Sequence, residues 1–487
     1  MPATYHPADA TLLRQAALVD GRWIEAQGRE SRCIRNPADQ SIVGVTPLLL
    51  AHDIDDAVAA ASRAFIGWSR TTARERAAIL RRLAELMRES IADLATIMTL
   101  EQGKPLAEAR GEIEYAAGFV EWFAEECKRV YSEAAPSPWP DKRLMVLRQP
   151  MGVVAAITPW NFPSAMVTRK AIPALAAGCT VILKPAEQTP FSALALGDLA
   201  QRAGLPAGVL NIVTGDAPMI GRTLCASREV RKVTFTGSTE VGRILMAQCA
   251  STIKKLALEL GGNAPFIVLN DADIDAAVIG AMASKYRNAG QTCVCANRFL
   301  VQSEVYSEFV EKLAEASAKL RVSHGFDPKA QQGPLIDEPA IEKVERLVGD
   351  AVAGGARVVV GGQRAVPDAL FYNPTVLADV TPTMLIAQEE IFGPVAPVIR
   401  FEDDEECIRI ANSTEYGLAA YFYGQNLARV WRMMEALEFG IVGINSGVVS
   451  TEVAPFGGVK QSGIGREGGR EGLQEFTELK YVCIGGI

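Results

Sequence analysis

The stretch that decides the fold is GVVAAITPWNFPSAMVTRKAIPALAAGCTVILK, residues 152–184. It opens with an apolar run, continues through a segment with helical spacing that ends at Gly178, and closes on a second apolar run. A buried strand, a helix and a second buried strand joined by short connections form one unit of a parallel sheet with a right-handed crossover. The stretch therefore predicts an α/β fold that binds ligands at the carboxyl ends of its strands.

Strands and helices also alternate after residue 184, both up to residue 260 and beyond it. Up to residue 260 we expect a helix over 190–203, strands over 209–213, 232–237 and 255–260, and a helix after the turn at Gly237. Beyond it we expect helices over 305–320, 404–412 and 426–438, and strands over 358–360 and 419–424. The second region is therefore also α/β.

The flanking segments have a different character. The first 125 residues are mainly helical in pattern after a short start, as amphipathic helices that cover a sheet. Prolines at 136, 138 and 140 then break the pattern, and Val130–Tyr131 and residues 144–147 are expected to form the two arms of a hairpin. The tail FTELKYVCI, residues 476–484, alternates as a strand with one exposed face does. Such a terminal strand can add to a sheet edge in a partner subunit.

Composition limits the class of protein. At about 150 residues per domain, 487 residues suggest three domains, and 49% hydrophobic with 22% charged residues is typical of a globular chain. The net charge of −8 argues against nucleic-acid binding. The N-terminus lacks a basic and then apolar leader, and no apolar run reaches 18 residues, so neither secretion nor a membrane span is expected. Nine dispersed cysteines fit reduced thiols and a cytoplasmic location.

Few residues are available for metal or imidazole chemistry. The three histidines, His6, His52 and His324, are scattered, which disfavours a histidine-rich metal site and a Ser-His-Asp hydrolase. Cys293 and Cys295 form a lone CxC, which supplies too few ligands for zinc. We therefore expect no metal site.

One turn points to a nucleotide. Gly237 and Gly242 bracket a Gly-x4-Gly turn that opens a helix, where backbone N–H groups can receive a pyrophosphate. The spacing is not GxGxxG and lacks the GK[ST] ending of a P-loop, which disfavours nucleoside triphosphate hydrolysis. Lys184 and Glu187 follow the second strand, where they can contact ribose hydroxyls. Solvated loop charges are the alternative interpretation of both.

A second group of residues has the types needed for covalent catalysis. Cys293, in RNAGQTCVCANR (287–298), lies in a segment with turn chemistry, and a cysteine attacks as its thiolate. Glu259, in LELGG, is a candidate general base beside two glycines that let the backbone pass closely. The Asn161 amide is a candidate donor to an oxyanion. These spacings alone do not bring the three residues together.

Seven motifs together resemble the aldehyde dehydrogenase superfamily, in the family's order and over nearly the whole chain. They are TPWNFP (158–163), KPAEQTP (184–190), FTGSTEVG (235–242), LELGGNAP (258–265), GQTCVCANR (290–298), EEIFGP (389–394) and PFGGVKQSGIGREGG (455–469). The variants YRNAGQTCVCANR and GINSGVVSTEVAPFGG are most similar to succinate-semialdehyde dehydrogenases, with glutarate-semialdehyde dehydrogenases and broader-range aldehyde dehydrogenases as alternatives.

The resemblance implies three parts. A Rossmann-like NAD(P)-binding domain comprises residues 1–124 and 146–259, an α/β catalytic domain comprises 260–458, and a small β oligomerisation part comprises 125–145 and 459–487. It also implies a homodimer or homotetramer, and it explains the missing GxGxxG because the family uses the Gly-x4-Gly turn.

The resemblance also implies the mechanism. Cys293 attacks the aldehyde to give a thiohemiacetal whose oxyanion Asn161 and the Cys293 N–H hold. Hydride then passes to the nicotinamide, and Glu259 activates the water that releases the acid from the thioester. The expected cofactor-binding residues are Trp160, Lys184, Glu187, Gly237, Ser238, Gly242, Glu390 and Phe392.

Two choices of ligand follow from charge. Glu187 suits free ribose hydroxyls and would repel a 2′-phosphate, which favours NAD, although Lys184 leaves NADP possible. Arg169, Arg287 and Ser450 match positions that resemble the family's carboxylate-binding group, and a guanidinium can hold a carboxylate bidentately. We therefore expect a small carboxylate-bearing aldehyde as substrate, with the four- and five-carbon semialdehydes unseparated.

Three further expectations concern Cys295 and the type of reaction. We hypothesise that Cys295 forms a reversible disulfide with Cys293, against the alternative of a small packing residue. A CoA-acylating member of the family is disfavoured by Glu259. A catalytically inactive binding protein on the same scaffold is disfavoured by the presence of Cys293, Asn161 and Glu259.

Overall fold

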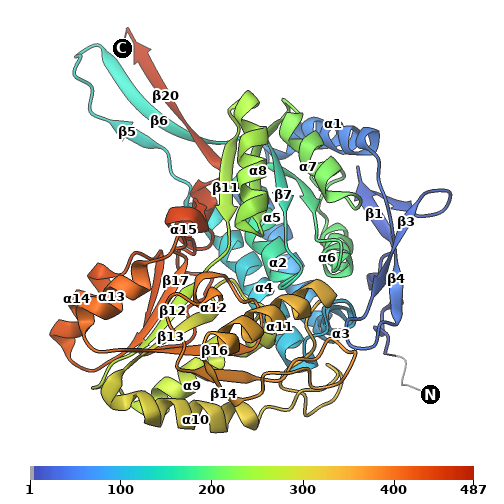
Figure 1. Ribbon diagram of the computed structural model, residues 1–487. Helices are drawn as coiled ribbons and strands as arrows, with labels where there is room; N and C mark the ends of the chain where they lie inside the picture. Colours follow the sequence, from blue (N-terminus) through green and yellow to red (C-terminus); the bar gives the residue numbers. More distant parts are fainter. Residues whose placement is uncertain (1–4, 487) are drawn as a thin grey trace.

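The computed structural model describes residues 5–486, whose strands form sheets of eight, seven, three and two strands (Figure 1). The α/β fold expected from residues 152–184 is confirmed. That stretch forms β7 (Val153–Ile157), α5 (Ala165–Ala177) and β8 (Thr180–Lys184), and β7 and β8 pair in parallel. Gly178 ends α5 with a φ of +97°, the left-handed value that favours glycine.

The eight-stranded sheet has the order β19-β11-β10-β7-β8-β9-β1-β2, and its five strands from β11 to β9 are parallel. Its other members are β19 (Gly463–Ile464), β11 (Lys255–Glu259), β10 (Val230–Thr236), β9 (Leu210–Ile212), β1 (Ala16–Val19) and β2 (Arg22–Glu25). The predicted strands over 209–213, 232–237 and 255–260 are thus confirmed to within two residues. Strand β19 joins this sheet although the resemblance assigned its residues to the oligomerisation part.

Both faces of this sheet are covered by helices. Val154 and Ala156 of β7 pack in one core with helices α2 to α6, whereas Val153 and Ala155 pack in another with α1, α7 and α8. A strand buried on both faces is the reason that the sequence shows a continuous apolar run. The helices are α1 (Ala51–Trp68), α2 (Ala73–Glu89), α3 (Ile91–Gln102), α4 (Leu106–Glu126), α6 (Pro190–Arg202), α7 (Ala217–Ala226) and α8 (Thr239–Cys249).

The seven-stranded sheet has the order β14-β15-β16-β13-β12-β17-β18 and is parallel except at β14. Its strands are β12 (Ala264–Val268), β13 (Ala296–Gln302), β14 (Arg357–Val360), β15 (Thr375–Ala378), β16 (Val395–Phe401), β17 (Ala419–Tyr423) and β18 (Ile441–Ile444). Its helices are α9 (Ile274–Lys285), α10 (Tyr306–Ala318), α11 (Glu338–Ala353), α12 (Leu385–Gln388), α13 (Asp404–Asn412) and α14 (Leu427–Ala436). The helices predicted at 305–320, 404–412 and 426–438 are confirmed, whereas the central strands β12 and β13 were not predicted.

A three-stranded sheet projects from the body and carries the C-terminal strand (Figure 1). It comprises β5 (Glu133–Ala135), β6 (Lys142–Pro150) and β20 (Thr477–Gly485), with β20 antiparallel to β6. A hairpin is therefore present, but its first arm is β5 rather than Val130–Tyr131, which lie outside any strand. The expected apolar face of the tail is not covered within one chain, because Leu479 is 62% and Tyr481 60% exposed.

The beginning of the described chain is less helical than expected. Four strands precede α1, because β3 (Ser31–Arg35) and β4 (Ile42–Pro47) form a hairpin after β1 and β2. One further helix, α15 (Gly469–Gln474), precedes β20. Within residues 5–486, no helix combines the length and the apolar character needed to cross a bilayer. The division of the chain into three parts at residues 124, 146, 259 and 458 stays a prediction.

Candidate active site

Cys293 lies at the junction of two cavities. The inner cavity, of about 270 Å³, is also lined by Arg169, Arg287 and Ser450. The strand-end cavity, of about 340 Å³, is lined by the loops that follow β7, β10 and β11. The thiol is therefore the point at which two separate ligands can meet.

The loop that carries Cys293 is held in an unusual backbone conformation. Asn288 and Ala289 have φ values of +52° and +55°, which residues other than glycine rarely adopt. The Asn288 N–H donates to Glu108 Oε2 at 3.0 Å, and its side chain donates to the Asn161 carbonyl at 3.0 Å. Strained backbone of this kind persists only where surrounding contacts enforce it, and it is common at functional sites.

Gly262 lets the neighbouring backbone approach the nucleophile closely. A Cβ atom on Gly262 would lie 2.4 Å from the carbonyl oxygen of Cys293, well inside any allowed contact. The expectation that the LELGG glycines permit a close backbone passage is confirmed at this position.

Burial governs the acidity of the thiol. Burial raises the pKa of Cys293 to about 12, Arg169 opposes this rise, and the carboxylate of Glu390 adds to it. The resting form is therefore the thiol, and reaction requires that a base or a bound ligand change its surroundings.

Asn161 is anchored through its main chain. Its carbonyl accepts hydrogen bonds from Lys104 Nζ at 2.9 Å and from Asn288, and its Nδ2 donates to the Gln291 carbonyl at 2.9 Å. Lys104 Nζ also pairs with Glu112 Oε2 at 2.5 Å. Because Nδ2 carries two protons, one remains to donate into the strand-end cavity that Asn161 lines.

Glu112 extends the same anchor to the start of α5. Its Oε1 accepts the N–H groups of Ser164 at 2.9 Å and Ala165 at 3.2 Å, which are otherwise free at a helix N-terminus. One buried ion pair therefore fixes both the Asn161 loop and the helix that carries Arg169.

Glu259 ends β11 in a buried position. Neither carboxylate oxygen has a hydrogen-bond partner in the described chain, and a Cβ on Gly457 would lie 2.9 Å from Oε1. Burial, reinforced by the charge of Glu467, raises the pKa of Glu259 well above its usual value. Glu259 lines neither cavity. A carboxyl with a raised pKa suits proton transfer near neutral pH.

Two arginines reach the inner cavity from different elements. Arg169 stacks over the Phe456 ring at 4.0 Å, and its Nη2 lies 2.9 Å from Glu467 Oε2. Nε makes no hydrogen bond within the described residues. Lys170 also pairs with Glu467. Glu467 therefore meets part of the charge of Arg169, while the buried Nε donor is left for a ligand that accepts a hydrogen bond.

The positive charge of Arg287 has fewer partners than that of Arg169. Its guanidinium lies 5.3 Å from the centre of the Phe162 ring, and Lys104 Nζ lies 4.2 Å from the same centre. Among residues 5–486 no carboxylate forms a salt bridge with Arg287. Glu108 is nearby, but burial raises the pKa of its carboxyl. The inner cavity can therefore accept the negative end of a ligand.

The strand-end cavity has features that fit a dinucleotide. Trp160, Gly237, Ser238, Glu390 and Phe392, all expected from the sequence to bind the cofactor, line it, and that role stays a prediction. Ser238 caps α8, with its Oγ accepting the Val241 N–H at 3.3 Å. Thr236 Oγ1, buried in the lining, has no partner within the part of the chain that the structure describes.

Glu390, Phe392 and Trp160 are held in the lining of this cavity by contacts with their neighbours. Glu390 Oε1 accepts the Gly262 N–H at 2.9 Å, and burial raises the pKa of Glu390 to about 7. Phe392 meets Trp160 edge to face, with ring centres 5.5 Å apart. Gly242 does not line the cavity and instead packs on Leu260, 2.6 Å from where its Cβ would be.

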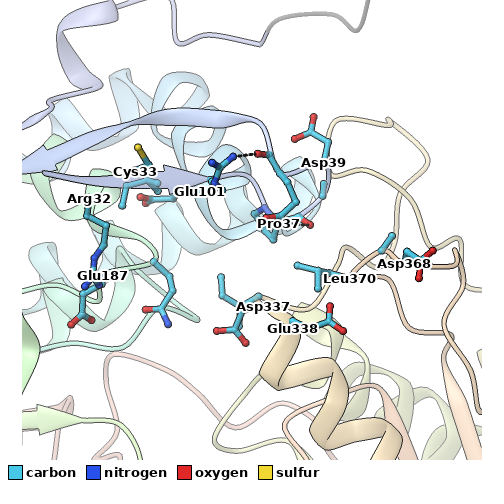
Figure 2. Close-up of a pocket in the computed structure, with 17 residues that line it drawn as sticks. Arg32, Cys33, Pro37, Asp39, Glu101, Glu187, Asp337, Glu338, Asp368 and Leu370 are labelled. Carbon is cyan, nitrogen blue, oxygen red and sulfur yellow. Dashed lines mark hydrogen bonds between the residues drawn. The ribbon is translucent and has the colours of Figure 1, made fainter.

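Lys184 and Glu187 form an ion pair of 2.8 Å at the carboxyl end of β8. Glu187 borders a larger cleft of about 930 Å³, where Arg32 from β3 extends towards it and Asp337 lies across the opening (Figure 2). Asp337 also lines the strand-end cavity, so the two spaces adjoin. Together they are large enough for an extended ligand with a ribose near Glu187.

Cys295 is placed differently from Cys293. Its thiol is buried 3.4 Å from Lys285 Nζ and lines neither cavity. A disulfide to Cys293 would require the Cys295 side chain to leave Lys285. The hypothesis of such a disulfide stays a prediction.

Sequence reasoning did not select Lys104, Glu108, Glu112, Tyr115 and Glu467, although all are near the site. Glu108, Glu112 and Tyr115 recur on one face of α4 at i, i+4 and i+7, and all three line the inner cavity. The sequence contained a pattern that could have identified these three residues. They are polar and recur at helical spacing on a helix whose opposite face is apolar. For Glu467 the signal was its place in the motif PFGGVKQSGIGREGG (455–469), although the sequence assigned it no role.

Comparisons with known proteins agree with this geometry. The model of the aldehyde dehydrogenase family matches residues 23–482. The chain is 58% identical to the NADP(+) succinate-semialdehyde dehydrogenase of Escherichia coli, over 98% of this chain and 99% of that protein. It is 57% identical to the glutarate-semialdehyde dehydrogenase of Pseudomonas aeruginosa, with the same coverage. A crystal structure of a succinate-semialdehyde dehydrogenase from Burkholderia pseudomallei superposes with a TM-score of 0.97 at 55% identity, covering 98% of this chain and 99% of that one.

Proposed function

The chain belongs to the aldehyde dehydrogenase family, and we propose that it oxidises succinate semialdehyde to succinate with a nicotinamide dinucleotide. The observation that carries the proposal is the position of Cys293 between an inner cavity with two arginines and a strand-end cavity beside a glycine turn. An aldehyde with a distant carboxylate fits the first cavity, and a dinucleotide fits the second.

The inner cavity supports a carboxylate-bearing substrate. Arg287 has no salt-bridge partner among the described residues, and the buried Nε of Arg169 makes no hydrogen bond, although Glu467 lies 2.9 Å from its Nη2. A substrate carboxylate can satisfy both guanidinium groups, with Ser450 Oγ as a further donor. The aldehyde at the other end of a short chain then faces Cys293.

The residues around Cys293 support a two-stage reaction. Cys293 loses its proton to water, its thiolate sulfur adds to the aldehyde carbon, and the resulting oxyanion is held by the free Asn161 Nδ2 proton and the Cys293 N–H. When bound, the nicotinamide would accept the hydride that leaves this carbon, and a thioester would remain on Cys293. Glu259 takes a proton from the water that attacks the thioester, after which the carboxylic acid leaves and the thiol is restored.

For the cofactor, we propose that the strand-end cavity and the adjoining cleft hold NAD in preference to NADP. Glu390 and Ser238 are suited to a ribose and a pyrophosphate, and the Glu187 carboxylate to free ribose hydroxyls. The Escherichia coli relative carries NADP(+) in its name, and Lys184 offers a charge that a 2′-phosphate can use. Both dinucleotides are therefore included in the test.

We also propose that the protein is a homodimer or homotetramer. The exposed apolar residues of β20, including Leu479 and Tyr481, lie on a projecting sheet whose burial a second subunit would provide. Free cysteines at nine positions are consistent with a cytoplasmic location.

The deciding experiment is a substrate panel. Purified protein is assayed for NADH or NADPH formation with succinate semialdehyde, glutarate semialdehyde and butanal. We expect kcat/KM for succinate semialdehyde with NAD to exceed that for butanal by more than about tenfold. A preference for butanal would refute the substrate proposal, and a preference for NADP would refute the cofactor proposal. A higher value for glutarate semialdehyde would select the activity named for the Pseudomonas relative.

A further inference from the structure

Two cysteines far from Cys293 face each other between α7 and α8, which lie side by side (Figure 1). Cys225 is in the last turn of α7, and Cys249 is the last residue of α8. Their Sγ atoms are 3.4 Å apart, and each residue is only 1% exposed. No other pair of cysteines among residues 5–486 has sulfur atoms in hydrogen-bond contact.

The surroundings make this pair chemically unlike an ordinary buried thiol. Lys254 Nζ donates to the carbonyls of Val230, at 2.9 Å, and of Ser227, the residue that follows α7. The two thiols share one hydrogen bond, and the positive charge of Lys254 favours the thiolate of either. One sulfur can therefore be present as a thiolate beside the thiol of the other.

The pair is buried but close to the surface. Ala226, next to Cys225, and Ala250, next to Cys249, are both exposed. Both cysteines are at the ends of their helices, where backbone opening is least costly. A small oxidant can reach such a position through fraying of one helix end, whereas a large reagent cannot.

We propose that Cys225 and Cys249 form a reversible oxidation site for hydroperoxides. The thiolate of one of the two cysteines attacks one oxygen of hydrogen peroxide, which gives a sulfenic acid and, after protonation, one water. The thiol of the other cysteine then attacks the sulfenic sulfur, a disulfide forms, and a second water leaves. Overall, two thiols and one peroxide give one disulfide and two waters, and a thiol reductant reverses the change.

The disulfide would join α7 to α8, whose first turn carries the Ser238 cap. It involves neither Cys293 nor any residue assigned above to catalysis, so it can be measured separately from activity. The approach of the sulfurs from 3.4 Å to a bond of about 2.0 Å needs a small movement of the helix ends.

The test is peptide mapping of the folded protein after graded hydrogen peroxide. Remaining thiols are alkylated during unfolding, and proteolysis is followed by mass spectrometry. We expect a linked pair of peptides containing Cys225 and Cys249, lighter by two hydrogens, that disappears after treatment with dithiothreitol. In Cys225→Ser, dimedone added during unfolding should trap a sulfenic acid at Cys249, with no linked peptide.

The controls come from the same chain. Cys33 and Cys483 are exposed and set the dose at which ordinary surface thiols oxidise, whereas Cys407 is buried without a contacting sulfur. Full alkylation of Cys225 and Cys249 at a dose that oxidises Cys33 and Cys483 would overturn the proposal. Equal oxidation of Cys407 would also overturn it, because it would indicate general unfolding. Peroxide can also inactivate the enzyme by oxidising Cys293. Such a loss of activity affects neither the linked Cys225–Cys249 peptide nor the oxidation of Cys407.

Discussion

Replacement of Arg287 by alanine tests how the inner cavity selects its substrate. Arg287 lies in the inner cavity over the Phe162 ring, at 5.3 Å, without a salt-bridge partner in the described chain. Its charge is therefore available to a ligand rather than consumed by the fold. The Arg287→Ala change should weaken the enzyme selectively towards aldehydes that carry a carboxylate.

The size of the effect follows from the contacts that are lost. A hydrogen bond to a charged group contributes about 1.5–3 kcal/mol. Since about 1.4 kcal/mol corresponds to a factor of ten, kcat/KM for succinate semialdehyde should fall about 10- to 150-fold. Loss of the contact with Phe162 should lower kcat/KM for every substrate, by an amount that corresponds to about 0.5–1 kcal/mol for an exposed cation–π contact. This common loss cancels in the ratio of kcat/KM for a charged aldehyde to kcat/KM for an uncharged one.

The assay compares kcat/KM for succinate semialdehyde and butanal, two four-carbon aldehydes that differ in the carboxylate. Arg287→Lys keeps a point charge without the bidentate fork and should fall between the parent and alanine variants. Ser450→Ala, which removes a single hydroxyl from the same cavity, should cost about tenfold or less. Equal losses on both aldehydes in Arg287→Ala would refute the reasoning.

Three further changes probe the other parts of the site. Glu259→Gln should give a burst of NADH followed by a steady rate at least about 10²-fold slower, because the thioester accumulates. The parent rate should rise with pH as the Glu259 carboxyl, whose pKa is raised by burial, loses its proton; a similar rise in the glutamine variant would contradict this role. Glu187→Ser should raise the NADP-to-NAD ratio of kcat/KM about tenfold, and an unchanged ratio would exclude Glu187 as the selector. In Gly262→Ala the new Cβ would lie 2.4 Å from the Cys293 carbonyl oxygen, so a denaturant titration should show a free energy of unfolding lower by about 1–3 kcal/mol. The control is Gly349→Ala, which adds a Cβ in open space within α11. The control should not lower the free energy of unfolding.

The parts of the fold that were predicted well are those with a strong local pattern. Strands β7 and β8 are buried on both faces, so they appear as continuous apolar runs, and Gly178 marks the end of α5 through its left-handed backbone. Central strand β12 is a buried apolar run of the same kind that was not assigned, whereas β13 carries Asn297, Arg298 and Gln302 among its apolar residues, which obscures its strand pattern. The first arm of the hairpin was misplaced because its register is set by pairing with β6, not by its own sequence.

Residue types and motifs in the sequence selected Cys293, Asn161 and Glu259, because nucleophile, donor and base are chemical properties of single side chains. The sequence also supplied the two arginines and the glycine turn through a family resemblance. Only the tertiary structure decided which charges are already paired. Lys184 is bound to Glu187 and Arg169 lies against Glu467, whereas Arg287 keeps its charge free.

The tertiary structure likewise decided the roles of Lys104 and Glu112, which hold the Asn161 loop and the start of α5 together. It brought Cys225 within 3.4 Å of Cys249 while directing Cys295 towards Lys285. These outcomes depend on distances between segments that are far apart along the chain. The residue type determines which functional group a side chain carries. Its charge state and its partners depend on the neighbours that folding brings into a low-dielectric interior.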